Sequence, residues 1–253
     1  MTTKKSHFEK LSVVEHLKKA REKGSRAISD FHAIEAPGHI SAGADSAKDA
    51  AVSTLLIQMI AHTLAIAQAK IFILLSVYLL GILFWKVGRS AHLGWAKLER
   101  INKAVTEEKY EIEHNREEER EEITQMYEAK GLREPLLSKI IDVLMADDNK
   151  LLGIMLEEEL GIPMEAYVHP LKQALGAGVG VLITAASIPL GLAISPSFGL
   201  FITTFCITGV ASICLAKMEK LEILEYTIKA LSITFLATFA TYFFTKFLIN
   251  EYL

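Results

Sequence analysis

The chain has 253 residues, of which 51% are hydrophobic, and its 27 Lys and Arg residues nearly balance 30 Asp and Glu residues. The mean hydropathy of +0.30 is too high for an ordinary soluble domain, so we expect an integral, multi-pass membrane protein. The two cysteines, Cys206 and Cys214, lie in an apolar stretch and argue against a disulfide framework or a zinc motif. We expect both to be small buried side chains.

Residues 1–44 are predicted to form a polar extension that contains one amphipathic helix pattern. Residues 1–30 have neither the apolar core nor the small-residue cleavage site of a signal peptide. We therefore expect the N-terminus to lie in the cytosol.

Two transmembrane helices are predicted within residues 45–91. The stretch 50–69 is uncharged and has the length that a spanning helix needs, although polar residues dilute it. The stretch 71–85 is strongly apolar but short, and it spans a bilayer if Lys70 and Lys86 extend to the two interfaces.

Residues 92–170 are charged throughout and follow a helical pattern that is interrupted at Gly131, Pro135 and Pro163. This pattern predicts a domain of about three helices outside the membrane. The segment holds 19 acidic residues against 10 Lys and Arg, which would concentrate cations near the membrane. The alternative is an ordinary solvated or coiled-coil helix face. Because the polar part is acidic, nucleic-acid binding is not expected.

Residues 171–253 contain three further apolar segments, at 173–195, 197–216 and 228–249. The predicted fold is therefore an all-α membrane protein with five transmembrane helices and a helical domain inserted between the second and the third. With a cytosolic N-terminus, the segments rich in Lys and Arg all fall on the cytosolic side, in agreement with the positive-inside rule.

Pairs of glutamates in the charged domain share one helix face. Glu108 with Glu111, and Glu119 with Glu122, are three residues apart, and such like-charge pairs destabilise a helix by about 0.2–0.5 kcal/mol each. A divalent cation would turn this repulsion into attraction. Carboxylates suit Mg²⁺, Ca²⁺ or Mn²⁺, whereas a thioether from Met155 shifts the preference toward a softer ion such as Fe²⁺.

Met155 lies four residues before Glu159, so an α-helix would place both on one face. Packing in the core is the alternative role for Met155.

The order of these residues resembles the cytosolic metal-binding domain of the vacuolar iron transporter family. That family has two E-x-x-E pairs, a Y-x-x-x-G-[LI] stretch and an M-x-x-x-E-L-G segment. In this chain the same pattern is formed, without a gap, by Glu108 and Glu111, Glu119 and Glu122, Tyr127 to Leu132, and Met155 with Glu159, Leu160 and Gly161.

The first apolar stretch adds to the resemblance, which covers about residues 45–250. The family opens its first span with D-G-[LIV]-V-S-T, and this chain has DAAVST at 49–54. The resemblance places Asp49 in the transport path, and a carboxylate at the head of a span is a functional candidate on physical grounds as well. A helix-capping residue at the interface is the alternative for Asp49. Met59 and His62 are further candidates for the path, although His62 could instead hydrogen-bond a neighbouring helix.

The resemblance implies transport of Fe²⁺, with Mn²⁺ as a second candidate, out of the cytosol against a counter-flow of protons. It implies a homodimer in a lipid bilayer, either the plasma (inner) membrane or a vacuole-like organelle membrane. The metal is cargo, and no tightly bound cofactor is expected. The implied metal ligands are Glu108, Glu111, Glu119, Glu122, Met155 and Glu159.

The second span departs from the family pattern. Where the family has a methionine and then G-E, this chain has Trp85 or Lys86 and then Arg89, and Ala50 replaces the glycine after the aspartate. Lysine in a cation path opposes the substrate. The alternative function is therefore a membrane-anchored module that binds metal or a protein partner without transport. No enzyme is expected, because the sequence has no nucleophile with a plausible base and no phosphate loop.

Overall fold

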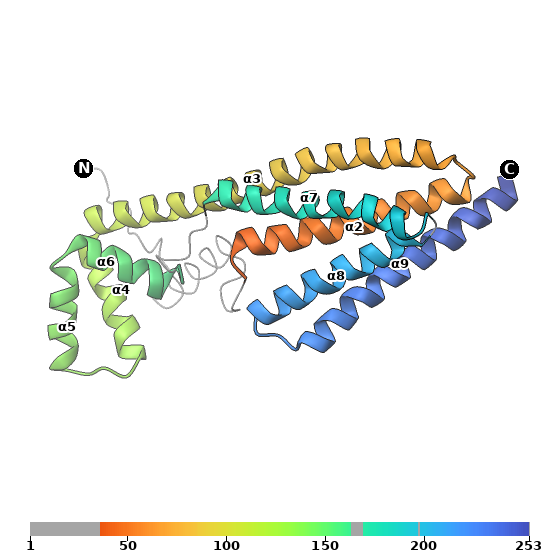
Figure 1. Ribbon diagram of the computed structural model, residues 1–253. Coiled ribbons are helices and arrows are strands. Elements are labelled where there is room, and N and C mark those ends of the chain that lie inside the picture. Colours follow the sequence, from red (N-terminus) through yellow and green to blue (C-terminus); the bar gives the residue numbers. More distant parts are fainter. Residues whose placement is uncertain (1–35, 163–168, 197, 253) are drawn as a thin grey trace. The chain divides into compact units, whose positions relative to one another are not determined.

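The computed structural model describes residues 36–162, 169–196 and 198–252, and every regular element in these ranges is a helix (Figure 1). The chain forms two compact units. The described part of the acidic unit is residues 96–162, and that of the membrane unit is residues 36–95 with 169–252. The division falls within one long helix, α3 (Gln68–His114).

The membrane unit is built from the first part of α3 and four other helices. Four helices of the described chain are long and apolar enough to cross a membrane, and these support an integral membrane protein. They are α3, α7 (Pro170–Ile194), α8 (Gly199–Met218) and α9 (Ile223–Tyr252). The remaining helix of this unit is α2 (Gly38–Thr63).

The first predicted span is the one that these criteria do not support. The helix begins at Gly38 and ends at Thr63, whereas the sequence pattern predicted a span over residues 50–69. The helix packs against α7, α8 and α9, and Figure 1 shows it beside α7 and α8. A helix surrounded by other helices needs small side chains for close packing more than large apolar ones for lipid, so its hydropathy is low. Its buried residues are Ser46, Ala47, Ala50, Ala51, Thr54, Leu55, Gln58 and Ala61.

The second predicted span, 71–85, is only part of α3, which continues to His114. The sequence from Lys86 to His114 contains Gly88 and Gly94 but no proline, and it is rich in strong helix formers, so the helix does not end where the apolar stretch ends.

Glycines set the distance between α2 and α7. A Cβ atom on Gly180 would lie 2.0 Å from the carbonyl oxygen of Gly43, and one on Gly176 would lie 1.9 Å from that of His39. Only glycine allows the two backbones to come this close. The hydroxyl of Thr184 then donates to the carbonyl of Ala47 at 3.0 Å. The glycines of LGAGVGV thus serve close helix packing, as small residues commonly do in membrane proteins.

The acidic unit consists of the end of α3 and four short elements. These are α4 (Arg116–Ala129), α5 (Leu136–Met145), α6 (Asp148–Ile154) and the π-helix η1 (Met155–Glu159). Its main apolar cluster combines side chains from α3, α4, α5, α6 and η1. They are Ile112, Ile123, Met126, Leu137, Ile141, Met145, Leu151 and Met155.

The Y-x-x-x-G-[LI] stretch forms the end of α4. Gly131 has a φ of +96°, a conformation that favours glycine. The N–H of Leu132 donates to the carbonyl of Tyr127 at 3.2 Å, and that of Gly131 to the carbonyl of Glu128 at 2.9 Å. These two bonds are those of a Schellman cap. The predicted stop at Gly131 is confirmed and Pro135 precedes α5, whereas Pro163 lies outside the described residues.

The two cysteines differ from the expectation in part. Both are free thiols, in agreement with the absence of a disulfide framework, but Cys206 and Cys214 are exposed and not buried. Both line an open, mostly apolar cavity with residues of α2 and α7, so hydrophobicity alone did not predict burial.

Candidate functional site

The buried face of α4 combines carboxylates with apolar side chains. Glu119, Glu122, Ile123 and Met126 are the buried residues of this helix, at the spacing of a single face. Glutamate is almost never fully buried unless it is paired, and Glu119 is only 1% exposed. Neither carboxylate oxygen of Glu119 has a hydrogen-bond partner among the described residues. This helix therefore pays an energetic cost to direct acid into the protein.

Two further elements contribute buried carboxylates. Glu108 lies one turn before the core residue Ile112 on α3, and Glu159 lies at the end of η1. Glu111, also on α3, is half-buried. The predicted metal ligands thus come from three separate elements of one compact unit, and all four fully buried glutamates of the described chain belong to the predicted set.

The electrostatics of Glu119 indicate that the carboxylates of α3 and α4 lie close together. Burial, together with the negative charges of nearby glutamates, raises the pKa of Glu119 from 4.5 to about 9. The glutamates responsible are Glu108, Glu122, Glu111 and Glu118, in order of effect. Glu118 is not among the predicted ligands, although its sequence spacing already places it on one helix face with Glu122, four residues later.

These carboxylates are neighbours, but their oxygens do not yet surround one point. Among the residues that the structure describes, no group of three or more His, Cys, Asp or Glu side chains is positioned to hold a metal ion. A cation bound here would require the glutamate side chains to rotate toward it. A divalent charge placed among these groups would offset their mutual repulsion.

Met155 lies at the start of η1, and its side chain is fully buried in the main apolar cluster of the acidic unit. The packing role that the sequence left open for Met155 is therefore present in the structure. The segment is a π-helix and not the α-helix that the one-turn spacing of Met155 and Glu159 assumed: the N–H of Leu160 donates to the carbonyl of Met155, five residues back, at 3.2 Å. π-Helical turns occur frequently at functional sites.

In the membrane unit, Asp49 is not an isolated carboxylate. The ammonium of Lys86, on α3, donates to Oδ2 of Asp49, on α2. The side chain of Lys86 is 12% exposed, whereas that of Asp49 is 61% exposed. The residue that departs from the family pattern thus contacts the aspartate that the family resemblance placed in the transport path.

The ion pair lines a cavity of about 300 Å³ between α2, α3 and α7. Four charged side chains border this cavity, namely Asp45, Asp49, Lys86 and Arg89. Lys48 forms an ion pair with Asp45 at 2.9 Å. The polar neutral residues at its edge are Ser41, Ser46, Ser90 and Gln173.

The other two residues predicted for the transport path lie further along α2. Met59 and His62 follow Asp49 by ten and thirteen residues, which separates them from it by about 15 and 20 Å along the helix axis. Met59 is half-buried and His62 is exposed. One ion cannot contact Asp49 and either residue at the same time.

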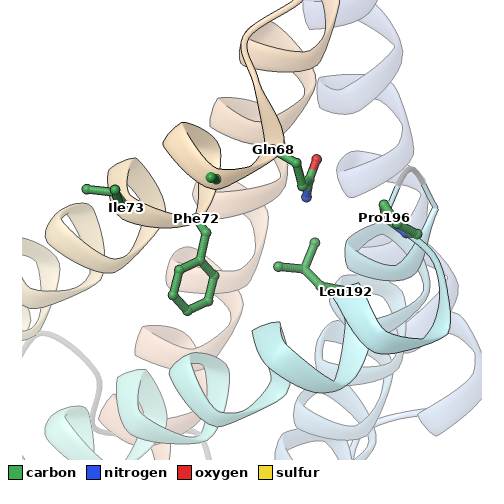
Figure 2. Close-up of a pocket in the computed structure, with 6 residues that line it drawn as sticks. Gln68, Phe72, Ile73, Leu192 and Pro196 are labelled. Carbon is green, nitrogen blue, oxygen red and sulfur yellow. The ribbon is translucent and has the colours of Figure 1, made fainter.

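A second cavity of the membrane unit, about 480 Å³, lies where α3 begins and α7 ends (Figure 2). Figure 2 shows Gln68, Phe72, Leu192 and Pro196 around it. These residues include no charged side chain, so this cavity offers a metal ion no carboxylate.

The pairing of Asp49 with Lys86 was missed in the sequence analysis. The two helices are joined by a short turn, and Asp49 and Lys86 lie at similar distances before and after it. An antiparallel helical hairpin places such residues at the same level, so counting from the turn could have found the pair.

Comparison with known proteins supports the family resemblance. The model of the VIT family matches residues 95–246, which is more than half of the chain. The match includes the acidic unit from α3 onward and the last three spans, and it begins after Asp49, Lys86 and Arg89. A search of curated proteins found no match. The chain therefore belongs to the VIT family, the vacuolar iron transporter family of membrane metal-ion transporters.

Proposed function

We propose that the protein transports Fe²⁺, and Mn²⁺ as a second substrate, out of the cytosol in exchange for protons. The observation that carries this proposal is the burial of Glu119 among Glu108, Glu111, Glu118 and Glu122, with its pKa raised to about 9. Such a cluster is unfavourable without a cation and becomes favourable with one. The ion is cargo, and the proposal includes no tightly bound cofactor.

The ligand chemistry supports a borderline divalent ion. Carboxylates of Glu108, Glu119, Glu122 and Glu159 supply hard oxygen ligands, and the thioether of Met155 supplies a softer one. Met155 is packed in the core, so it would coordinate only after a local rearrangement of η1.

Proton exchange follows from the same carboxylates. A carboxylate must lose its proton to bind a metal, and protonation releases the metal again. On this proposal the acidic unit faces the cytosol and gathers the ion, and Asp49 receives it within the membrane unit. A homodimer would provide two copies of each helix to enclose the path.

The test is Fe²⁺-dependent proton flux into proteoliposomes that contain the full chain. We compare the parent with Asp49→Ala and with the double variant Glu119→Ala/Glu122→Ala. The matched control is Glu117→Ala/Glu121→Ala, which removes two exposed glutamates from the same helix. We expect Asp49→Ala to abolish flux, the buried double variant to raise the Fe²⁺ concentration needed for half-maximal flux, and the control to behave as the parent.

The second candidate function is a membrane-anchored module that binds metal without transporting it. The ion pair between Lys86 and Asp49 favours it, because that aspartate is already neutralised. Fe²⁺ binding by the full chain, together with no flux in any variant, would establish this module and reject transport.

A further inference from the structure

The cavity between α2, α3 and α7 is poorly suited to a free metal ion. Its walls carry the carboxylates of Asp45 and Asp49 and the cations of Lys86 and Arg89. Lys48 also neutralises Asp45 from one turn away. A divalent cation that enters this cavity meets no excess of negative charge, unlike a cation that enters the glutamate cluster of the acidic unit.

Lys86 is held as a partner of Asp49 by its surroundings. Its side chain is largely buried, whereas a lysine that only balances surface charge is mostly exposed. Lys86 lies on α3, a candidate transmembrane helix. An unpaired charged side chain within a membrane is energetically costly, and pairing with an opposite charge reduces that cost. Arg89 lines the same cavity three residues later, so a second cation lies on the wall that carries Lys86.

We infer that Lys86 is a tethered counter-ion of Asp49: its ammonium occupies the carboxylate that a divalent substrate needs, and a metal ion binds at Asp49 only when it displaces Lys86. This inference rests on the proposed function, since it assigns a specificity-determining residue to the membrane site of that function. The apparent affinity of Asp49 for metal is its intrinsic affinity multiplied by the fraction of time in which Asp49 is not paired with Lys86.

The inference predicts what removal of the tethered charge does. Lys86→Met leaves Asp49 without its ammonium, so the full chain in detergent gains one Mn²⁺ site, or binds Mn²⁺ at the membrane site about tenfold more tightly. The gain is absent from Lys86→Met/Asp49→Asn. Lys86→Arg retains a cation and keeps the parental affinity, which a purely steric role for the side chain would not predict.

The measurement is Mn²⁺ binding to the purified full chain by equilibrium dialysis, followed by Mn²⁺ uptake into proteoliposomes. The matched control is Lys229→Met, which removes the lysine of another ion pair, with Glu225 on α9, away from the cavity. If Lys229→Met gives the same gain, a general change in charge explains the result and the inference is wrong. Lys86→Gln serves as a second neutral variant if Lys86→Met does not fold.

The two readouts separate this inference from the proposed function. A gain in Mn²⁺ binding that depends on Asp49, without uptake by any variant, supports the tethered counter-ion and rejects transport. Uptake by the parent with an unchanged half-saturation concentration and unchanged binding in Lys86→Met and Lys86→Gln supports transport and overturns the counter-ion. Uptake by the parent together with a lower half-saturation concentration in both neutral variants supports both.

Discussion

Carboxylates in the acidic unit lie among other carboxylates, whereas Asp49 in the membrane unit lies beside a lysine. Burial, reinforced by four nearby glutamates, raises the pKa of Glu119 to about 9, whereas Asp49 is ion-paired with Lys86 and more exposed. The first arrangement opposes ionisation of Glu119 unless a cation balances its charge, and in the second Lys86 already balances Asp49. Affinity for metal should therefore be concentrated in the acidic unit.

The largest expected effect concerns the packing that positions Asp49. Gly180→Ala would place a methyl group 2.0 Å from the backbone carbonyl of Gly43, so α2 and α7 must separate, at a cost of about 3 kcal/mol in stability. Thermal denaturation of the full chain in detergent measures this loss. Gly81→Ala is the control, because a Cβ atom there meets nothing within 4 Å. Equal stability of the two variants would show that the close helix contact is not formed.

The next effect tests the acidic side of the comparison. Glu119→Ala/Glu122→Ala should lower the affinity for Mn²⁺ about 100-fold, equivalent to roughly 2.7 kcal/mol, because two buried ligands are lost. Equilibrium dialysis of the full chain measures it. The exposed pair variant Glu117→Ala/Glu121→Ala should change the affinity little, since these groups face solvent. A similar loss of Mn²⁺ affinity in both variants would show that the metal is attracted by the overall negative charge of the acidic unit and not by a specific site.

A smaller effect appears in the pH dependence of stability without metal. Below pH 4.5 Glu119 is protonated in both the folded and the unfolded chain, and between pH 4.5 and about 9 only the unfolded chain releases this proton. Its contribution therefore makes the folded state less stable as the pH rises through this window. Glu119→Gln should remove that slope and stabilise the protein by on the order of 2 kcal/mol at pH 7.

Melting temperatures of parent and Glu119→Gln between pH 5 and 9, in the presence of a chelator, measure this effect. Glu117→Gln, on the exposed face of α4, is the control and should retain the parental slope. If the melting temperatures of parent and Glu119→Gln have the same dependence on pH, the pKa of Glu119 is not raised in the folded protein.

The smallest effect concerns the cap of α4. Gly131→Ala forces an L side chain to a φ of +96° and should lower the free energy of unfolding by about 1 kcal/mol. The amount of metal bound at saturation should not change. Gly153→Ala, within α6 and with nothing within 4 Å of its Cβ, should be neutral or slightly stabilising. A loss of metal binding in Gly131→Ala at a temperature where it is folded would give this glycine a role beyond the cap.

Much of the fold followed from sequence because its signals are local. The long apolar segments at 173–195, 197–216 and 228–249 correspond to α7, α8 and α9, since hydrophobicity over about 20 residues is enough to identify a spanning helix. The bounds of the first span were predicted less well. The helix α2 packs against other helices, so it is rich in small residues and lacks the large apolar side chains of a helix that faces lipid. The length of α3 was missed because its apolar stretch ends long before the helix does.

The sequence by itself determined the membrane class, the order of the acidic residues and the family to which they belong, since these depend on composition and on spacing along one chain. Only the tertiary structure decided that Glu119 and Glu122 are directed inward, that Met155 begins a π-helix and that Lys86 contacts Asp49. The inward direction of the glutamates and the Lys86 contact depend on how one helix packs against another, which residues far apart in sequence fix. The π-helix depends on a shift in backbone hydrogen-bond register, from the N–H of Leu160 to the carbonyl of Met155.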